Sequence, residues 1–283
     1  MPSYDLARER FRLAHPHLGV LGLLHDNEPV VEELIQARDE LIEIGLVSDE
    51  GEISPVLSDL VAVMSKPVIQ VLVEVTGAQG IMTHGLVIGE EAVFAHEEWP
   101  GTGESEYVQI EPATVVFELA RIVGLRQRAR AEARPPVLSV ESTMGALDAV
   151  LNAIGEMAPE EQDQPGATGA RGRQVLTVTD EELDHVSRGV FADLISALRA
   201  NWRMTVVWPS VEGDTPGTGA ASFAVWDCGH FGYWHRELPA EPIVEGQVGP
   251  ETPLRLVQVP TKKVWKMITD LLPNRDQIRS TAA

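Results

Sequence analysis

The chain has very little cysteine: Cys228 is the only one in 283 residues. A single thiol cannot form an intramolecular disulfide, and it cannot supply a cysteine-based structural zinc site. No window approaches about 18 uninterrupted apolar residues, so we expect no membrane insertion. The apolar run at 18–24 follows mixed charges and precedes an acidic segment, which favours a buried segment over a secretory signal. These absences predict a cytoplasmic protein.

Basic residues are also scarce, with 22 Lys and Arg against 43 Asp and Glu and a formal net charge of −21. Such a chain repels phosphate backbones, so we expect no nucleic-acid partner. The excess of acid is compatible with simple solubility. It is equally compatible with an acidic surface that keeps an adhesive binding face from self-associating, and charge alone does not decide between the two.

The known catalytic and cofactor motifs are missing. The sequence holds no G-x-S-x-G, H-E-x-x-H, Walker A or C-x-x-C pattern. The glycine-rich stretches at 101–106 and 166–173 lack the strand, helix and lysine of a phosphate-binding loop. Adjacent acidic pairs such as Glu90-Glu91 diverge from each other and favour solvated surface over an acid–base dyad. We therefore expect no catalytic residues, no cofactor and no enzymatic activity.

The first half of the chain predicts helices followed by a small sheet. Residues 26–67 read as two helices, the first capped by Asn27 and ended by Gly45. Three segments with alternating or β-branched residues then predict a strand meander, at 68–75, 81–88 and 92–97. The stretch 107–125 reads as a short strand that passes through Pro112 into a helix.

The second half begins after an irregular arginine- and proline-rich stretch, 126–136, which we interpret as a connector. Residues 140–157 read as a helix, and the polar run 158–174 reads as a mobile loop. Thr179 and Glu182 form a capping-box pattern that predicts the start of the next helix.

An internal repeat is the strongest signal in the chain. Residues 56–73 align without gaps with 190–207, and 108–123 align with 257–271. Matched positions include Val56/Val190, Asp59/Asp193, Leu60/Leu194, Val73/Val207, Pro112/Pro260 and Phe117/Trp265. The order of helix, strand meander and strand-Pro-helix thus occurs twice. We predict a single domain, 1–283, with duplicated halves at about 1–125 and 137–283. The predicted fold is α/β of the α+β type, with one central, mainly antiparallel sheet.

The stretch 222–237 resembles a metal site because it contains Cys228, His230 and His235. In the repeat, however, it occupies the place of two strands joined by a tight turn, and the turn of the first half has no cysteine. A thiol and two imidazoles also fall short of a tetrahedral set. We therefore predict a turn at Cys228–His230 and no metal.

The chain resembles the EspG family associated with ESX (type VII) secretion. The resemblance is carried by ARDELIEIGLVSDEGEISPVLSDLVAVMSKP (37–67), ADLISALRANWRMTVVW (192–208) and VQVPTKKVWKMITDLLP (257–273). It extends from about residue 28 to 273. It implies two pseudo-twofold halves sharing one sheet, flanked by two helical bundles. It also implies a non-enzymatic cytosolic chaperone that binds the apolar helical tip of a PPE protein within a PE–PPE heterodimer, keeps it soluble and directs it to its secretion system.

The expected binding face follows from alternation along the strands. On 68–75 the apolar row Ile69, Val71, Val73 and Val75 should face helices, leaving the other row on the open face. The gap-free alignment matches Arg203 with Ile69 and so places it on the face covered by helices, whereas the polarity of Arg203 favours the open face. We side with polarity, because burying an unpaired arginine is costly, and a one-residue bulge would reconcile the two. The predicted partner-binding residues, with the tryptophans as anchors, are Gln70, Leu72, Glu74, Arg203, Thr205, Trp226, Trp234 and Arg236.

Two alternatives stay open at this point. The first is an α/β enzyme that uses a histidine as general base, and its candidates are His84, His96, His230 and His235. A strongly shifted histidine pKa in a closed pocket would favour it. The second is a small-molecule or regulatory binding module on a duplicated scaffold. We expect a monomer or a weak homodimer.

Overall fold

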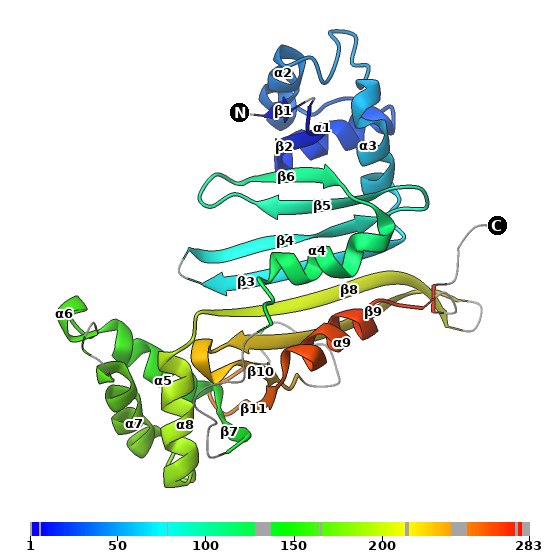
Figure 1. The fold of residues 1–283 in the computed structure, drawn as a ribbon. Coiled ribbons are helices and arrows are strands. Elements are labelled where there is room, and N and C mark those ends of the chain that lie inside the picture. The colour runs from blue at the N-terminus through cyan, green and yellow to red at the C-terminus, as the bar shows by residue number, and fades with distance from the viewer. Residues whose placement is uncertain are drawn as a thin grey trace.

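One antiparallel sheet organises the molecule. The computed structural model describes residues 2–5, 7–77, 79–127, 137–162, 164, 166–212, 215–238, 248–274 and 277–278. In this part of the chain the sheet has 11 strands, in the order β1-β2-β6-β5-β4-β3-β8-β9-β10-β11-β7. Figure 1 shows the strands stacked from the N-terminal end of the molecule to the far end.

The first half supplies one side of the sheet. Its strands are β1 (Ser3–Asp5), β2 (Arg10–Ala14), β3 (Ile69–Gly77), β4 (Gly80–Ile88), β5 (Val93–Glu98) and β6 (Glu104–Gln109). Its α-helices are α1 (His15–His25), α2 (Ile35–Glu43), α3 (Ser58–Ser65) and α4 (Val115–Ile122), with short 3-10 turns at Glu32–Leu34, Pro55–Leu57 and Pro112–Thr114.

The second half supplies the other side. Its strands are β7 (Ser139–Thr143), β8 (Ala200–Glu212), β9 (Thr215–Asp227), β10 (Tyr233–Arg236) and β11 (Pro253–Val259). Its helices are α5 (Met144–Gly155), α6 (Pro159–Gln162), α7 (Ala167–Thr179), α8 (His185–Ser196) and α9 (Thr261–Leu271), with a 3-10 turn at Gly229–Phe231.

The strand order is symmetric about the contact between β3 and β8. Moving outward from that contact, β3, β4, β5, β6 and β2 correspond to β8, β9, β10, β11 and β7. The helices follow the same scheme: α3 leads into β3 as α8 leads into β8, and α4 follows β6 as α9 follows β11. The predicted fold of two related halves sharing one sheet is confirmed. That the halves 1–125 and 137–283 arose by duplication stays a prediction, and residues 128–136 of the predicted connector lie outside the described residues.

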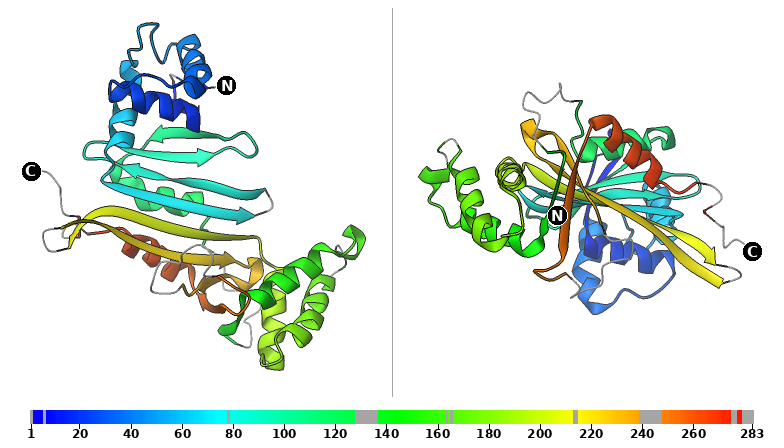
Figure 2. Two further views of the ribbon diagram at one scale, coloured as in Figure 1. Left: turned by 180° about the vertical axis from the view of Figure 1, so that it is seen from behind. Right: turned by 90° about the horizontal axis from the view of Figure 1, so that it is seen from below.

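Helices cover the two faces of the sheet differently (Figure 2). On one face, α4 and α9 pack across the central strands over a core that includes Val71, Val73, Met204 and Val206. On the other face, α1–α3 cover β2, β4, β5 and β6, while α5, α7 and α8 cover β7, β9, β10 and β11. We call these groups the first bundle (α1–α3) and the second bundle (α5, α7, α8). They leave the middle of their face uncovered.

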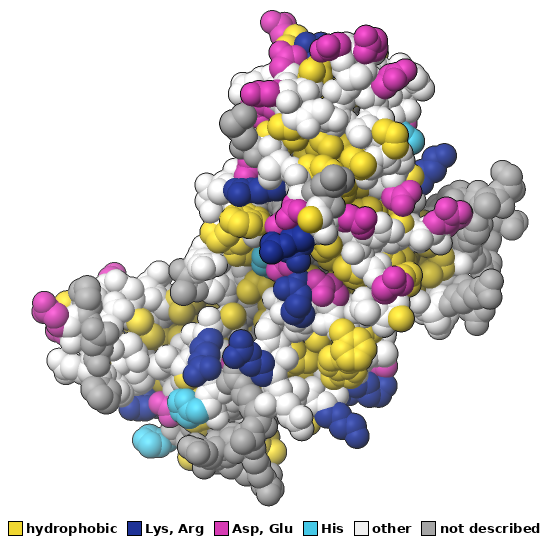
Figure 3. Space-filling view, turned by 45° about the horizontal axis from the view of Figure 1, so that its top comes forward, with side chains coloured by type: hydrophobic (Ala, Val, Ile, Leu, Met, Phe, Trp, Pro, Cys, Tyr) yellow, Lys and Arg dark blue, Asp and Glu magenta, His cyan; other side chains and the backbone are white. Residues whose placement is uncertain are grey.

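Acidic side chains crowd the end of the molecule that carries the first bundle (Figure 3). None of the helices in the described residues combines the length and apolarity needed to cross a membrane.

Several local predictions are confirmed. The meander is β3–β4–β5, the strand through Pro112 into a helix is β6 and α4, and Gly45 has the left-handed φ of 73° expected of a helix-ending residue. The apolar run at 18–24 lies within α1, where Val20 and Leu21 are buried.

The predicted loop at 158–174 is wrong, because α7 begins at Ala167. Two of its glycines, Gly169 and Gly172, lie inside α7 and allow close packing: a Cβ on Gly172 would lie 3.2 Å from Ala192 Cβ on α8. The capping box is also wrong, since Thr179 ends α7. Instead Asp184 caps α8 by accepting hydrogen bonds from the Val186 and Ser187 N–H groups.

Other boundaries needed tertiary pairing to define them. The strands β1, β2 and β7 were not predicted; each is three to five residues long and lies at or next to a sheet edge. The first predicted helix does not begin at Asn27, which has a φ of 57° after α1. Helical structure resumes only at Glu32.

The gap-free alignment is wrong by one residue where helix passes into strand. On the helices it holds, since the aligned pair Leu60 and Leu194 are both fully buried. On the strands it fails, because Val73 is buried under α4 and α9, whereas its counterpart Val207 lies opposite Gln70 on the other face. The one-residue offset expected from polarity is therefore confirmed.

Candidate binding surface

The uncovered middle of the sheet is the candidate binding surface, and we call it the open face. It consists of Gln70, Leu72, Glu74 and Thr76 of β3, Arg203 and Thr205 of β8, Ala220, Ser222 and Ala224 of β9, and Arg236 of β10. Cross-strand register places these side chains on one side, because directly opposed residues in an antiparallel sheet share a face. Leu72, at its centre, leaves 41% of its surface exposed.

Six of the eight residues predicted from the sequence meet on this surface. Leu72 lies opposite Thr205, which lies opposite Ser222. Two residues further along β3, and therefore on the same face, Glu74 lies opposite Arg203. That row continues through Ala224 to Arg236, so the two arginines lie on either side of an alanine.

The prediction that Trp226 and Trp234 are exposed anchors is wrong. Alternation places them on the correct face, but the second bundle covers that part of it, and they retain only 3% and 0% exposure. The two tryptophans oppose each other on β9 and β10, and the Trp234 Nε1 donates to the Phe231 carbonyl at 3.2 Å. They belong to the core, and we leave them out of the candidate surface.

Small side chains on β9 were missed by sequence reasoning. Ala220 and Ser222 are exposed and Ala224 is short, so β9 forms a shallow floor between the taller side chains of its neighbours. On the opposite side of β3, the exposed Ile81 of β4 lies across from Thr76 and extends the apolar part of the surface. The alternation of small residues at 220, 222 and 224 was a usable signal.

Three of the four histidines of the enzyme alternative, His84, His96 and His235, do not line the described cavities. Burial lowers the pKa of His96 to about 4 and also lowers the pKa values of His84 and His235. His96 stacks on Tyr107 with ring centroids 5.7 Å apart. None of these three histidines lines either the cavity of about 580 Å³ beside the second bundle or that of about 230 Å³ beside the first.

His230 does line the larger cavity, together with Asp193 and Ser196. These residue types could form a nucleophile, base and orienting group, but that arrangement needs hydrogen bonds between them. Ser196 Oγ instead donates to the Ala192 carbonyl at 2.8 Å, and Asp193 pairs with Arg173 at 2.6 Å. Ser196, His230 and Asp193 therefore lack the hydrogen-bonding geometry of a Ser-His-Asp catalytic triad.

The three residues of the apparent metal motif are separated. Cys228 is fully buried in the core beneath the second bundle, and His235 points to the opposite side of the sheet from its neighbour Trp234. Across the described parts of the chain, no group of three His, Cys, Asp or Glu side chains could hold a metal ion.

Comparison with solved structures identifies a similar fold. The Mycobacterium tuberculosis type VII secretion system chaperone EspG5, solved in complex with a PE25–PPE41 dimer, matches with a TM-score of 0.51 and 13% sequence identity. The match covers 93% of this chain and 97% of that chain. No family model and no curated protein matches the sequence. The resemblance to the EspG family is thus confirmed at the level of the fold.

Proposed function

We propose that this protein is a chaperone of a PE–PPE heterodimer and binds the apolar helical tip of its PPE subunit. The observation that carries the proposal is the similarity of the fold, over nearly the whole of both chains, to a chaperone solved with a PE–PPE dimer. In this proposal the protein acts in the cytoplasm without catalysing a reaction. It keeps its partner soluble and directs it to an ESX secretion system.

The open face supports this proposal chemically. A helical tip with apolar residues needs an apolar centre and a polar rim. Leu72 and Ile81 supply exposed apolar area, while Gln70, Thr205 and Ser222 supply hydrogen-bonding groups around it. The two bundles rise on either side of this surface, so a docked helical tip could also contact their inner flanks (Figure 2).

The test begins with the identity of the partner. The tagged protein is recovered from its own cytosol, and mass spectrometry asks whether a PE–PPE pair is bound in stoichiometric amount. That pair is then co-produced with the protein and the dissociation constant is measured. Absence of any PE–PPE pair, or binding no tighter than to an unrelated helical dimer, contradicts the proposal.

A substitution then tests the location. Leu72→Glu places a charge at the centre of the open face, and we expect binding to weaken at least about thirtyfold, as for loss of an interface hot spot of about 2 kcal/mol. The matched control is Phe117→Glu, because Phe117 is 64% exposed on α4, on the opposite face. Equal effects of the two variants would show that the partner does not dock on the open face.

A further inference from the structure

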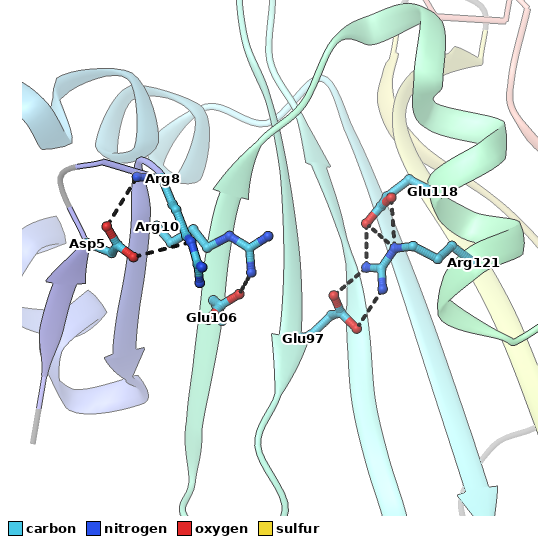
Figure 4. A network of polar contacts seen from close by, with 7 residues as sticks. All are labelled: Asp5, Arg8, Arg10, Glu97, Glu106, Glu118 and Arg121. Atoms are coloured by element: carbon cyan, nitrogen blue, oxygen red, sulfur yellow. Dashed lines mark hydrogen bonds and ion pairs between the residues drawn. The ribbon is translucent and has the colours of Figure 1, made fainter.

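Two arginines on the open face, Arg203 and Arg236, form no ion pair within the described residues, whereas seven other arginines do. Arg10 pairs with Glu106, and Arg121 pairs with Glu97 and Glu118 (Figure 4). Among the described residues the arginines in ion pairs are Arg8, Arg10, Arg12, Arg38, Arg121, Arg173 and Arg255. Arg203 and Arg236 are not among them, although the chain has 43 acidic residues.

The two arginines lie in one cross-strand row, and their side chains are partly withdrawn from water. Ala224 separates Arg203 and Arg236 in the register, so their Cα atoms are about 10 Å apart, or two strand spacings. Both side chains are half-buried. Burial first, and then the positive charge of Arg203, lower the pKa of Arg236 below its ordinary value.

Their hydrogen-bonding capacity is almost unused within the described structure. Each guanidinium has five N–H donors. The Nε of Arg203 is buried without a hydrogen-bond partner. Arg236 donates through Nη2 to the sulfur of Met144 at 3.2 Å, and a thioether is a weak acceptor. Glu74 is the cross-strand neighbour of Arg203, yet the two form no ion pair in the described structure. This arrangement is unfavourable in the free protein, because two like charges are partly withdrawn from water and neither has an ion-pair partner among the described residues.

We propose that Arg203 and Arg236 together bind a carboxylate, an Asp or Glu side chain, on the helical tip of the docked partner. This inference rests on the proposed function and specifies which tips the open face accepts. A carboxylate between the two groups would use the fork geometry of the guanidinium and neutralise the repulsion between the arginines. An apolar tip without an acidic residue would leave both charges buried beneath it, which selects against such partners.

A protein carboxylate fits this site better than a polyanion. A formal net charge of −21 repels nucleic acid and anionic membranes at long range, and two arginines offer little compensation. The site also lies on the sheet between two projecting bundles, which admits a narrow helical tip and keeps a flat bilayer away.

The experiment measures the dissociation constant for the PE–PPE pair recovered with the wild-type protein. We expect Arg203→Gln and Arg236→Gln each to weaken binding about 10- to 100-fold, the range for a lost charge-assisted hydrogen bond. We expect the double variant to lose less affinity than the product of the two single fold-losses, because both guanidinium groups bind the same carboxylate. Arg255→Gln is the matched control: its guanidinium pairs with Glu237 on the opposite face, and binding should change less than about twofold.

Stability of the free protein separates a binding role from a structural one. Because neither arginine is neutralised, we expect Arg203→Gln to melt at the wild-type temperature or above it. A melting temperature that falls in parallel with the affinity would overturn the inference. In the decisive experiment, the acidic residues of the partner tip are changed to Lys one at a time. For one of these Lys variants, Arg203→Glu should bind at least tenfold more tightly than the wild-type protein does.

The possible failures are distinguishable. If the wild-type protein binds no PE–PPE pair, both the proposed function and this inference fall. If the wild-type protein binds and Leu72→Glu weakens binding, but both Gln variants bind within about twofold of wild type, the docking surface stands. The carboxylate inference is then wrong.

Discussion

Replacing Trp234 with Ala should destabilise the protein strongly, because the side chain has 0% exposure beneath the second bundle. Trp→Ala changes in cores typically cost about 3–5 kcal/mol. The lost indole hydrogen bond to the Phe231 carbonyl adds little, since that carbonyl keeps a bond from Gln258 Nε2 at 2.9 Å. We therefore expect a loss of about 4 kcal/mol in the free energy of unfolding. For a chain of this size that corresponds to a fall of roughly 8–16 °C in melting temperature.

The assay is urea unfolding followed by far-ultraviolet circular dichroism, with melting temperature as a second readout. Trp99→Ala is the matched control, because Trp99 is 42% exposed and its ring makes a cation–π contact with Arg12 at 4.2 Å. We expect this control to lose about 1 kcal/mol or less. Because both substitutions are Trp→Ala, the difference between their losses in free energy of unfolding measures the effect of burial.

The opposite outcome would restore the original interpretation of Trp234 as a binding anchor. If Trp234→Ala is within about 1 kcal/mol of wild type and yet loses affinity for the PE–PPE pair, the second bundle does not cover this tryptophan in solution. The assignment of Trp234 to the core would then be refuted.

Two further predictions concern the middle of the sheet. Because burial holds the folded-state pKa of His96 at about 4, against an ordinary 6.5, the unfolded chain binds a proton that the folded chain does not bind between these values. The contribution of neutral, buried His96 to the free energy of unfolding should therefore be fully present above pH 6.5 and fall by on the order of 2–3 kcal/mol as the pH drops to 4. In urea titrations at successive pH values, His96→Phe should reduce this dependence on pH. Gly85→Ala should cost about 2 kcal/mol or more, since its Cβ would lie 2.1 Å from the Val71 carbonyl oxygen and 2.8 Å from His96 Nε2. A wild-type unfolding midpoint for Gly85→Ala would show that the strands separate more easily than their packing indicates.

The local sequence was sufficient wherever one residue's neighbours decide its conformation or face. Alternation along 68–75 and the polarity of Arg203 correctly assigned the two faces of β3 and β8, even against the gap-free alignment. Pro112 and Pro260 correctly marked two strand-to-helix junctions, because proline lacks the N–H that a continuing strand requires.

Tertiary structure decided which part of a face is covered. Alternation placed Trp226 and Trp234 on the same face as Arg203, but it carries no information on where helices from distant segments pack. The second bundle buries both tryptophans and leaves Arg203 at its margin. The glycines of α7 likewise looked like loop residues in the sequence. Only the tertiary structure shows that they lie against α8, where a larger side chain would not fit.

The meeting of Arg203 and Arg236 depends on the same kind of information. The two residues come from β8 and β10, and they become neighbours only because β9 pairs with both strands in register and presents Ala224 between them. The sequence determined the chemistry of each side chain and the face it occupies. The sheet's long-range order determined which charges share a site without a partner, since strand pairing brings together residues that no local pattern connects.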